Sequence, residues 1–142
     1  MSLSEKTIET VKSSAALVAE NSESITSRMY EILFENYPDT KELFKDADPD
    51  QYKKLAAAIS AYAANIDNLN LLSQSLETIA KSHVKAKVKP EHYPLVAVAF
   101  LGAMQDVLAD AATKEVLLAW KDAYLYLAHI LIVREKKLYH QQ

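Results

Sequence analysis

Cysteine is absent from the 142 residues, and glycine occurs only once, at Gly102. Without cysteine the chain has no disulfide, no thiolate nucleophile and no sulfur ligand for a metal, and a reducing, cytoplasmic location is expected. The near absence of glycine removes the phosphate-binding loops of nucleotide-binding folds and the residues that hairpin turns usually require. These absences favour helices joined by short turns.

A strong charge of one sign is also lacking. The 16 Lys and Arg residues face 19 Asp and Glu residues, which gives a formal net charge of −3. That balance lacks the basic excess of a nucleic-acid binder and the acidic excess of a disordered tail. No apolar run approaches the roughly 18–20 residues that cross a bilayer, and the polar start is unlike a signal or transit peptide. We therefore expect one domain over residues 1–142, with neither nucleic acid nor membrane as a partner.

Apolar residues recur at three- and four-residue steps in at least six stretches, and no stretch alternates convincingly with period two. The predicted fold class is all-α. A capping box from Ser2 to Glu5 predicts the first helix start. The second helix is expected over residues 22–37, where Pro38 stops it and opens a short helical turn. Asp48 is expected to cap the following helix, with Pro49 at its first position.

Several polar residues occupy positions that this periodicity assigns to the core. His83 completes an apolar stripe in its helix and Glu135 follows one in the last helix, while Tyr30, Gln51 and Tyr93 lie on stripes elsewhere. A polar group buried at such a position costs free energy unless it is hydrogen-bonded or holds a ligand. Together these residues suggest a polar-lined cavity between helices.

Spacing alone leaves simpler interpretations open. His83 also fits a core histidine bonded to a carbonyl group, and Glu135 fits a carboxylate at the edge of its stripe, paired with a lysine in water. The tyrosines fit ordinary core aromatics. His92, His129 and His140 suit the simpler interpretation better than His83 does.

Four segments resemble, in order, those of the bacterial haemoglobins and of the globin domains of flavohaemoglobins. They are SRMYEILFENYPDTKELF, DQYKKLAAAISAYAANIDNL, IAKSHVKAKVKPEHYPLV and LAWKDAYLYLAHILIVREKKLY. The resemblance covers essentially the whole chain, and it is especially close to the single-domain globins of thermophiles. It implies a globin fold that holds haem b between a distal and a proximal helix.

The resemblance also implies roles for the residues singled out above. His83 is implied as the iron ligand, with Tyr93 and Glu135 as the catalytic candidates of a proximal hydrogen-bond network. Tyr30 and Gln51 are implied as donors on the distal side. The full set of residues implied to bind the cofactor is Tyr30, Phe44, Gln51, Leu55, His83, Val88, Tyr93, Val96, Phe100 and Tyr124.

Two departures from the family pattern bear on function. The turn between Phe44 and Gln51 is shorter than in many members, which is expected to draw Gln51 away from the iron. Ser82 stands where flavohaemoglobins often have a lysine. No flavin- or NAD-binding domain is expected after the globin, so self-sufficient enzyme activity is not expected.

Three functions follow from these observations. The first is a haem protein that binds O2 reversibly with help from Tyr30, with NO and CO as further ligands and oxygen transport as a role. The alternative is an enzyme, a nitric oxide dioxygenase that detoxifies NO and depends on a separate reductase. A third is a plain helical bundle or interaction protein without haem. The same pocket residues suit the first two functions, so the residues do not separate them.

Overall fold

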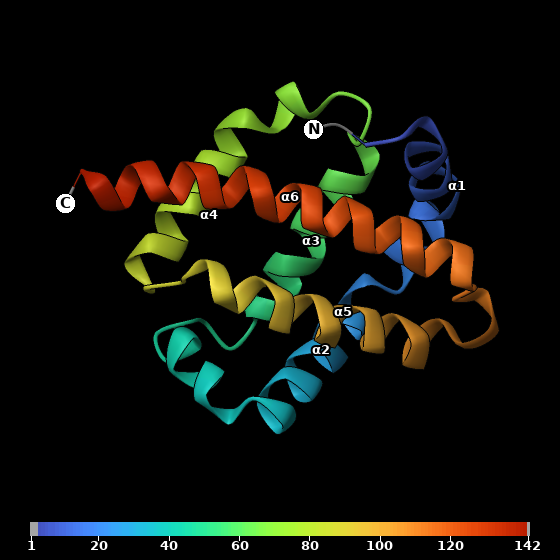
Figure 1. Cartoon of the computed structure of the whole chain (residues 1–142). Helices are drawn as coiled ribbons and strands as arrows, with labels where there is room; N and C mark the ends of the chain where they lie inside the picture. Colours follow the sequence, from blue (N-terminus) through green and yellow to red (C-terminus); the bar gives the residue numbers. More distant parts are fainter. Residues whose placement is uncertain (1–2, 142) are drawn as a thin grey trace.

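The chain is described here by a computed structural model over residues 3–141, in which α5 and α6 run side by side and α3 crosses behind them (Figure 1). No strand occurs in that range, so the predicted all-α fold is confirmed. Six α-helices and four 3-10 helices follow one another in the order α1 (Glu5–Glu20), α2 (Ser22–Asn36), η1 (Pro38–Phe44), α3 (Gln51–Ala64), η2 (Leu69–Leu72), α4 (Ser73–Lys85), η3 (Pro90–His92), α5 (Tyr93–Leu108), η4 (Ala109–Ala111) and α6 (Lys114–His140).

The helix starts follow local capping chemistry, although one predicted cap, Asp48, was wrong. The hydroxyl of Ser4 accepts the backbone N–H of Thr7 at 3.1 Å and caps α1, whereas the predicted cap, Ser2, lies outside the described residues. The α3 helix begins at Gln51, two residues later than expected. The carboxylate of Asp48 pairs with Lys54 across the first turn of α3, so it does not cap that helix.

The core consists of two clusters that share helices α5 and α6. The larger cluster fills the space among α1, α2, α3, α5 and α6, with Met29, Leu33 and Met104 essentially inaccessible to solvent. The smaller cluster lies where α4 packs on α6 near the start of α5, and its buried residues are Leu76, Ala80, Tyr93, Ala128 and Leu131. Burial of these apolar side chains is the dominant stabilising contribution of such a fold. The smaller cluster positions the histidine at the end of α4.

Two stretches, Pro90–Ala111 and Lys114–His140, are long and apolar enough to cross a membrane by length and composition alone. Core helices of globular proteins meet the same criterion, and both stretches supply residues to the larger cluster. The absence of a membrane partner stays a prediction.

Candidate functional site

His83 lies in the last turn of α4, with its side chain about one-third exposed. Its Nδ1 is 2.9 Å from Glu135 Oε2 and 3.0 Å from the hydroxyl oxygen of Tyr93. The Tyr93 hydroxyl donates to the Glu135 carboxylate, at 2.7 Å from Oε2 and 2.9 Å from Oε1. Three residues from α4, α5 and α6, up to 52 positions apart in sequence, therefore form one closed hydrogen-bonded network.

Glu135 is 3% exposed, and its partners in the network are His83 and Tyr93. The alternative that it pairs with a lysine in water is therefore wrong. A buried carboxylate needs hydrogen-bond donors, and a tyrosine hydroxyl and an imidazole N–H supply them. Burial, followed by the adjacent Glu135 carboxylate, raises the pKa of Tyr93, which keeps its hydroxyl protonated.

The proton positions follow from this network. Because the Tyr93 proton is directed to Glu135, the carboxylate takes its second hydrogen bond from Nδ1–H of His83. A neutral imidazole protonated at Nδ1 carries a lone pair on Nε2, and Nε2 makes no hydrogen bond within residues 3–141. His83 thus presents a free, oriented nitrogen ligand.

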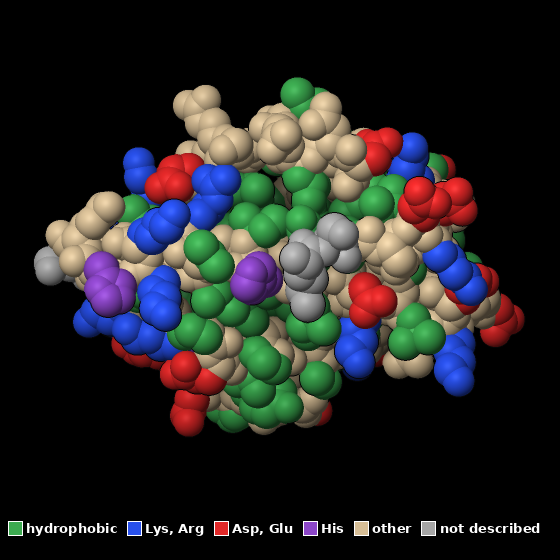
Figure 2. All heavy atoms as spheres, turned by 45° about the horizontal axis from the view of Figure 1, so that its top comes forward, with side chains coloured by type: hydrophobic (Ala, Val, Ile, Leu, Met, Phe, Trp, Pro, Cys, Tyr) green, Lys and Arg blue, Asp and Glu red, His purple; other side chains and the backbone are tan. Residues whose placement is uncertain are grey.

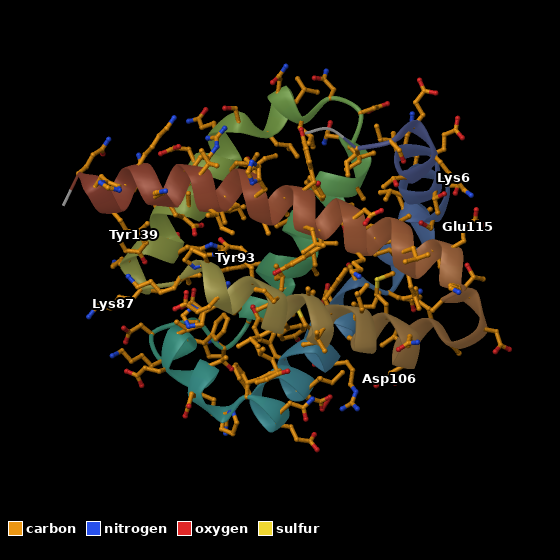
Figure 3. All side chains as sticks on the ribbon, viewed as in Figure 1. Lys6, Lys87, Tyr93, Asp106, Glu115 and Tyr139 are labelled. Atoms are coloured by element: carbon orange, nitrogen blue, oxygen red, sulfur yellow. The ribbon has the colours of Figure 1, made fainter. Side chains whose placement is uncertain are left out.

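Two further tyrosines, both on α6, donate hydrogen bonds to backbone carbonyl groups next to the network. Tyr124 donates to the carbonyl of Tyr93 at 3.1 Å, and Tyr139 donates to the carbonyl of Val88 at 2.7 Å. The N–H of Val88 in turn donates to the carbonyl of His83 at 2.9 Å. The turn after α4 is therefore tied to the histidine at one end and to α6 at the other. Figure 3 shows Tyr93 and Tyr139 in this end of the molecule.

Tyr139 was missed by the sequence reasoning. It lies four residues after Glu135, so the two share a face of α6, and this spacing is the signal that would have found it. Burial, and then Glu135, raises the pKa of Tyr139. The ammonium group of Lys89 lies 4.1 Å from the centre of the Tyr139 ring, a distance at which a cation is attracted by the aromatic face.

A second group of predicted residues gathers around a cavity of about 240 Å³ between α2 and the start of α3. Its lining includes Tyr30, Phe44 and Gln51. The Tyr30 ring packs edge-on against Phe44, with centroids 5.2 Å apart, and stacks on Phe34 at 5.7 Å. Gln51 at the start of α3 and Tyr30 of α2 therefore face the same cavity.

Burial raises the pKa of Tyr30 to about 12, an effect that nearby Gln51 partly opposes. Tyr30 and Gln51 line the same cavity. The protonated hydroxyl of Tyr30 can therefore donate to an acceptor held in this cavity.

The remaining predicted residues connect these two groups. Leu55 and Val96 pack against the larger cluster, and Phe100, 3% exposed, stacks on Tyr124 with ring centroids 6.3 Å apart. Val88 packs against the smaller cluster. The cavity lining does not include His83, so the predicted residues form a distal group and a proximal group.

The other three histidines have local roles. Nδ1 of His92 accepts the backbone N–H of Lys89 at 2.9 Å, and His129 and His140 are exposed. Over residues 3–141, no group of three or more His, Asp or Glu side chains is placed to hold a metal ion. A single histidine is a sufficient protein ligand when a porphyrin supplies four nitrogens to the iron, so the donor set suits haem.

A model of the globin family matches residues 27–131. An uncharacterised globin-like protein of Aquifex aeolicus is 54% identical over 139 residues, which cover 98% of this chain and 99% of the relative. A carbene transferase engineered from a Rhodothermus marinus protein, provisionally assigned as a nitric oxide dioxygenase, superposes with a TM-score of 0.94 at 40% identity, over 98% and 97% of the two chains.

A flavohaemoglobin of Malassezia yamatoensis, whose structure contains FAD and haem, superposes with a TM-score of 0.90 at 30% identity. The match covers the whole of this chain but 39% of the flavohaemoglobin. The chain therefore corresponds to about two-fifths of that protein.

Proposed function

Because the chain belongs to the globin family, whose cofactor is haem, we propose that it binds O2 reversibly at a haem b iron held by Nε2 of His83. The observation that carries this proposal is the His83–Glu135–Tyr93 network, which leaves Nε2 as the unpaired, oriented nitrogen of the ring. When bound, haem supplies an iron atom with one open coordination position for a gas. The predicted globin fold is confirmed by the family match and by the superpositions.

On the proximal side, Glu135 fixes the ring of His83 and withdraws the Nδ1 proton toward itself. A hydrogen bond to a carboxylate makes an imidazole more electron-rich, and therefore a stronger donor at Nε2. Tyr93 holds the carboxylate at both of its oxygens, so the carboxylate cannot turn away from the ring without breaking two bonds.

On the distal side, the hydroxyl of Tyr30 would donate a hydrogen bond to O2 held in this cavity. The pKa of its phenol, raised to about 12, keeps the hydroxyl intact throughout the physiological range. O2 that takes up electron density from a haem iron would carry partial negative charge, so a hydrogen bond from Tyr30 would be charge-assisted and would slow the release of the ligand. Gln51 lines the same cavity as Tyr30.

Absorption spectra of the haem-loaded chain test this proposal. The ferrous protein is expected to give a distinct spectrum with O2 and to return to the ferrous spectrum when O2 is removed under argon. CO and NO should each give spectra of their own. Rapid, complete oxidation on the first exposure to O2, without a reversible form, would contradict reversible binding.

A second candidate is nitric oxide dioxygenation with a separate reductase. The hydrogen bond between His83 and Glu135 favours it, because it would make the imidazole a stronger electron donor to a bound iron. The provisional assignment of the Rhodothermus marinus relative favours it as well. Adding NO to the O2-loaded protein should then yield one nitrate per haem and leave the iron ferric. NADH or NADPH alone should not sustain the reaction, whereas an added ferredoxin or flavodoxin reductase system should. Repeated turnover with NADH and the pure chain would contradict the need for a reductase.

A further inference from the structure

The small net charge of the chain conceals a strong separation of charge. Residues 81–89 and 134–140 contain seven of the 16 Lys and Arg residues and one of the 19 Asp and Glu residues, Glu135. These two segments therefore carry a formal charge of +6, and the rest of the chain carries −9, for the total of −3.

The fold brings the two basic segments together. The α4 helix packs on α6, and Tyr139 in the last turn of α6 binds both the Val88 carbonyl and the ammonium group of Lys89. We use the term basic end for the exposed lysines that result, namely Lys81, Lys85, Lys87, Lys89, Lys136 and Lys137. Figure 2 shows Lys and Arg side chains gathered at this end of the molecule.

The charge of the basic end is not neutralised by ion pairs. Within residues 3–141, none of its six lysines forms a salt bridge. Glu135 is buried in the proximal network, and nearby Glu42 and Glu77 are engaged by Lys45 and Arg134 at 2.8 and 3.2 Å. Glu91 is a remaining exposed carboxylate beside this surface.

The lysines of the basic end also flank His83, the proposed iron ligand, and the turn that follows it. Lys87 and Lys89 flank Val88, whose N–H donates to the carbonyl of His83. A macromolecule bound at this surface therefore lies against the turn directly after the proximal helix. Electron transfer from a donor protein to haem requires such an approach of the donor.

From this placement we infer that the basic end is the docking surface for an acidic one-electron donor protein, a flavoprotein that reduces the haem. The inference rests on the proposed function. The flavin of the donor loses one electron, the ferric iron gains it and becomes ferrous, and no bond is made or broken. An acidic partner is attracted by the +6 end and repelled by the rest of the chain at −9, so the charge separation orients the encounter as well as accelerating it.

Stopped-flow reduction of the ferric, haem-loaded chain by reduced flavodoxin, a small acidic flavoprotein, tests this inference. The variant Lys85→Glu with Lys137→Glu reverses two charges at the basic end. The matched control, Lys114→Glu with Lys121→Glu, makes the same change of charge at exposed lysines near the start of α6. Lys121 and Lys137 are 16 residues apart on one helix, or about 24 Å at 1.5 Å per residue, which exceeds the screening length of about 8 Å at physiological salt.

The bimolecular rate constant for the basic-end variant should fall by about tenfold or more at low ionic strength, and that of the control by less than about twofold. The difference should disappear near 1 M salt, where the screening length is about 3 Å. Equal slowing of both variants, or of neither, overturns the inference. So does tighter binding of the parent chain to a DNA duplex or to phosphatidylglycerol vesicles than to flavodoxin, because the surface would then belong to a polyanion.

Reduction by dithionite separates this inference from the proposed function. Dithionite needs no docking surface, so all three proteins should be reduced by it and should then bind O2 reversibly. A chain that fails to bind O2 after dithionite reduction refutes the proposed function, whatever the flavodoxin rates are. A chain that binds O2 normally but shows no local charge effect with flavodoxin refutes the docking surface alone.

Discussion

Replacing Tyr30 with Phe removes a single oxygen atom from the distal cavity. The ring contacts of Tyr30 with Phe34 and Phe44, at 5.7 and 5.2 Å between centroids, do not involve the hydroxyl and are retained by Phe. Tyr30 and Gln51 line the same cavity, so the hydroxyl of Tyr30 is open to a ligand held there. The substitution therefore measures the full contribution of a hydrogen bond from this hydroxyl to that ligand.

A hydrogen bond to a charged partner contributes roughly 1.5–3 kcal/mol. At about 1.4 kcal/mol per factor of ten, its loss should raise the O2 dissociation rate constant by about 10- to 100-fold. Bound CO carries much less charge, so its dissociation rate should change by less than about threefold. Stopped-flow displacement of O2 by CO, and of CO by NO, gives the two rate constants for the parent and the variant.

Gln51 and Tyr30 line the same cavity, and a double-mutant cycle tests whether Gln51 acts through Tyr30. Gln51→Leu alone should raise O2 dissociation by less than Tyr30→Phe does, because it leaves the Tyr30 hydroxyl in place. In the Tyr30→Phe background the same change should have almost no effect. If Tyr30→Phe leaves O2 release within about twofold of the parent while Gln51→Leu accelerates it strongly, Gln51 is the direct donor and the reasoning is refuted.

Four further predictions concern the proximal side and stability. His83→Ala should lose haem on gel filtration, seen as loss of Soret absorbance with helical circular dichroism retained; a variant that keeps its haem has another ligand. Glu135→Gln should lower the iron–histidine stretching frequency in resonance Raman spectra and raise the midpoint potential, because a negative charge beside the ring is lost; an unchanged stretch would remove Glu135 from the network. Gly102→Ala should stabilise α5 by about 1 kcal/mol and raise Tm by about 3–5 °C, since the new Cβ meets Ile32 at an ordinary 3.4 Å; a fall in Tm would show a clash. Several tyrosines have a higher pKa in the folded chain than in the unfolded chain. Their contribution to the free energy of unfolding is complete below pH 10, and it is lost as the pH rises through their pKa values in the folded chain. Phenolate absorbance at 295 nm should therefore rise together with helix loss above about pH 10, and independent titration of all eight tyrosines near pH 10 would contradict the burial of Tyr30, Tyr62, Tyr93 and Tyr124.

The helices and their approximate ends could be predicted because they depend on residues close together in sequence. Apolar residues at three- and four-residue steps predicted the helices, and Pro38 marks a boundary that the structure retains. The cap of α3 could not be predicted in this way. Asp48 satisfies the local rule for a cap, but the cationic side chain of Lys54 competes for its carboxylate, and sequence spacing alone does not rank the two partners.

In the candidate site, too, some features follow from the sequence and others depend on the tertiary structure. The sequence by itself determined which polar residues lie on apolar stripes, since that is a matter of periodicity, and it singled out His83, Tyr93 and Glu135. Only the tertiary structure decided that Glu135 is buried against His83 and paired with no lysine, because 52 residues separate them and the packing of α4 on α6 sets their distance. For the basic end, too, the sequence and the tertiary structure each determine a different part. The sequence contains its charges as two separate segments within a nearly neutral chain, and the packing of α4 and its following turn against the end of α6 joins them into one surface, because electrostatic potential depends on distances in space and not along the chain.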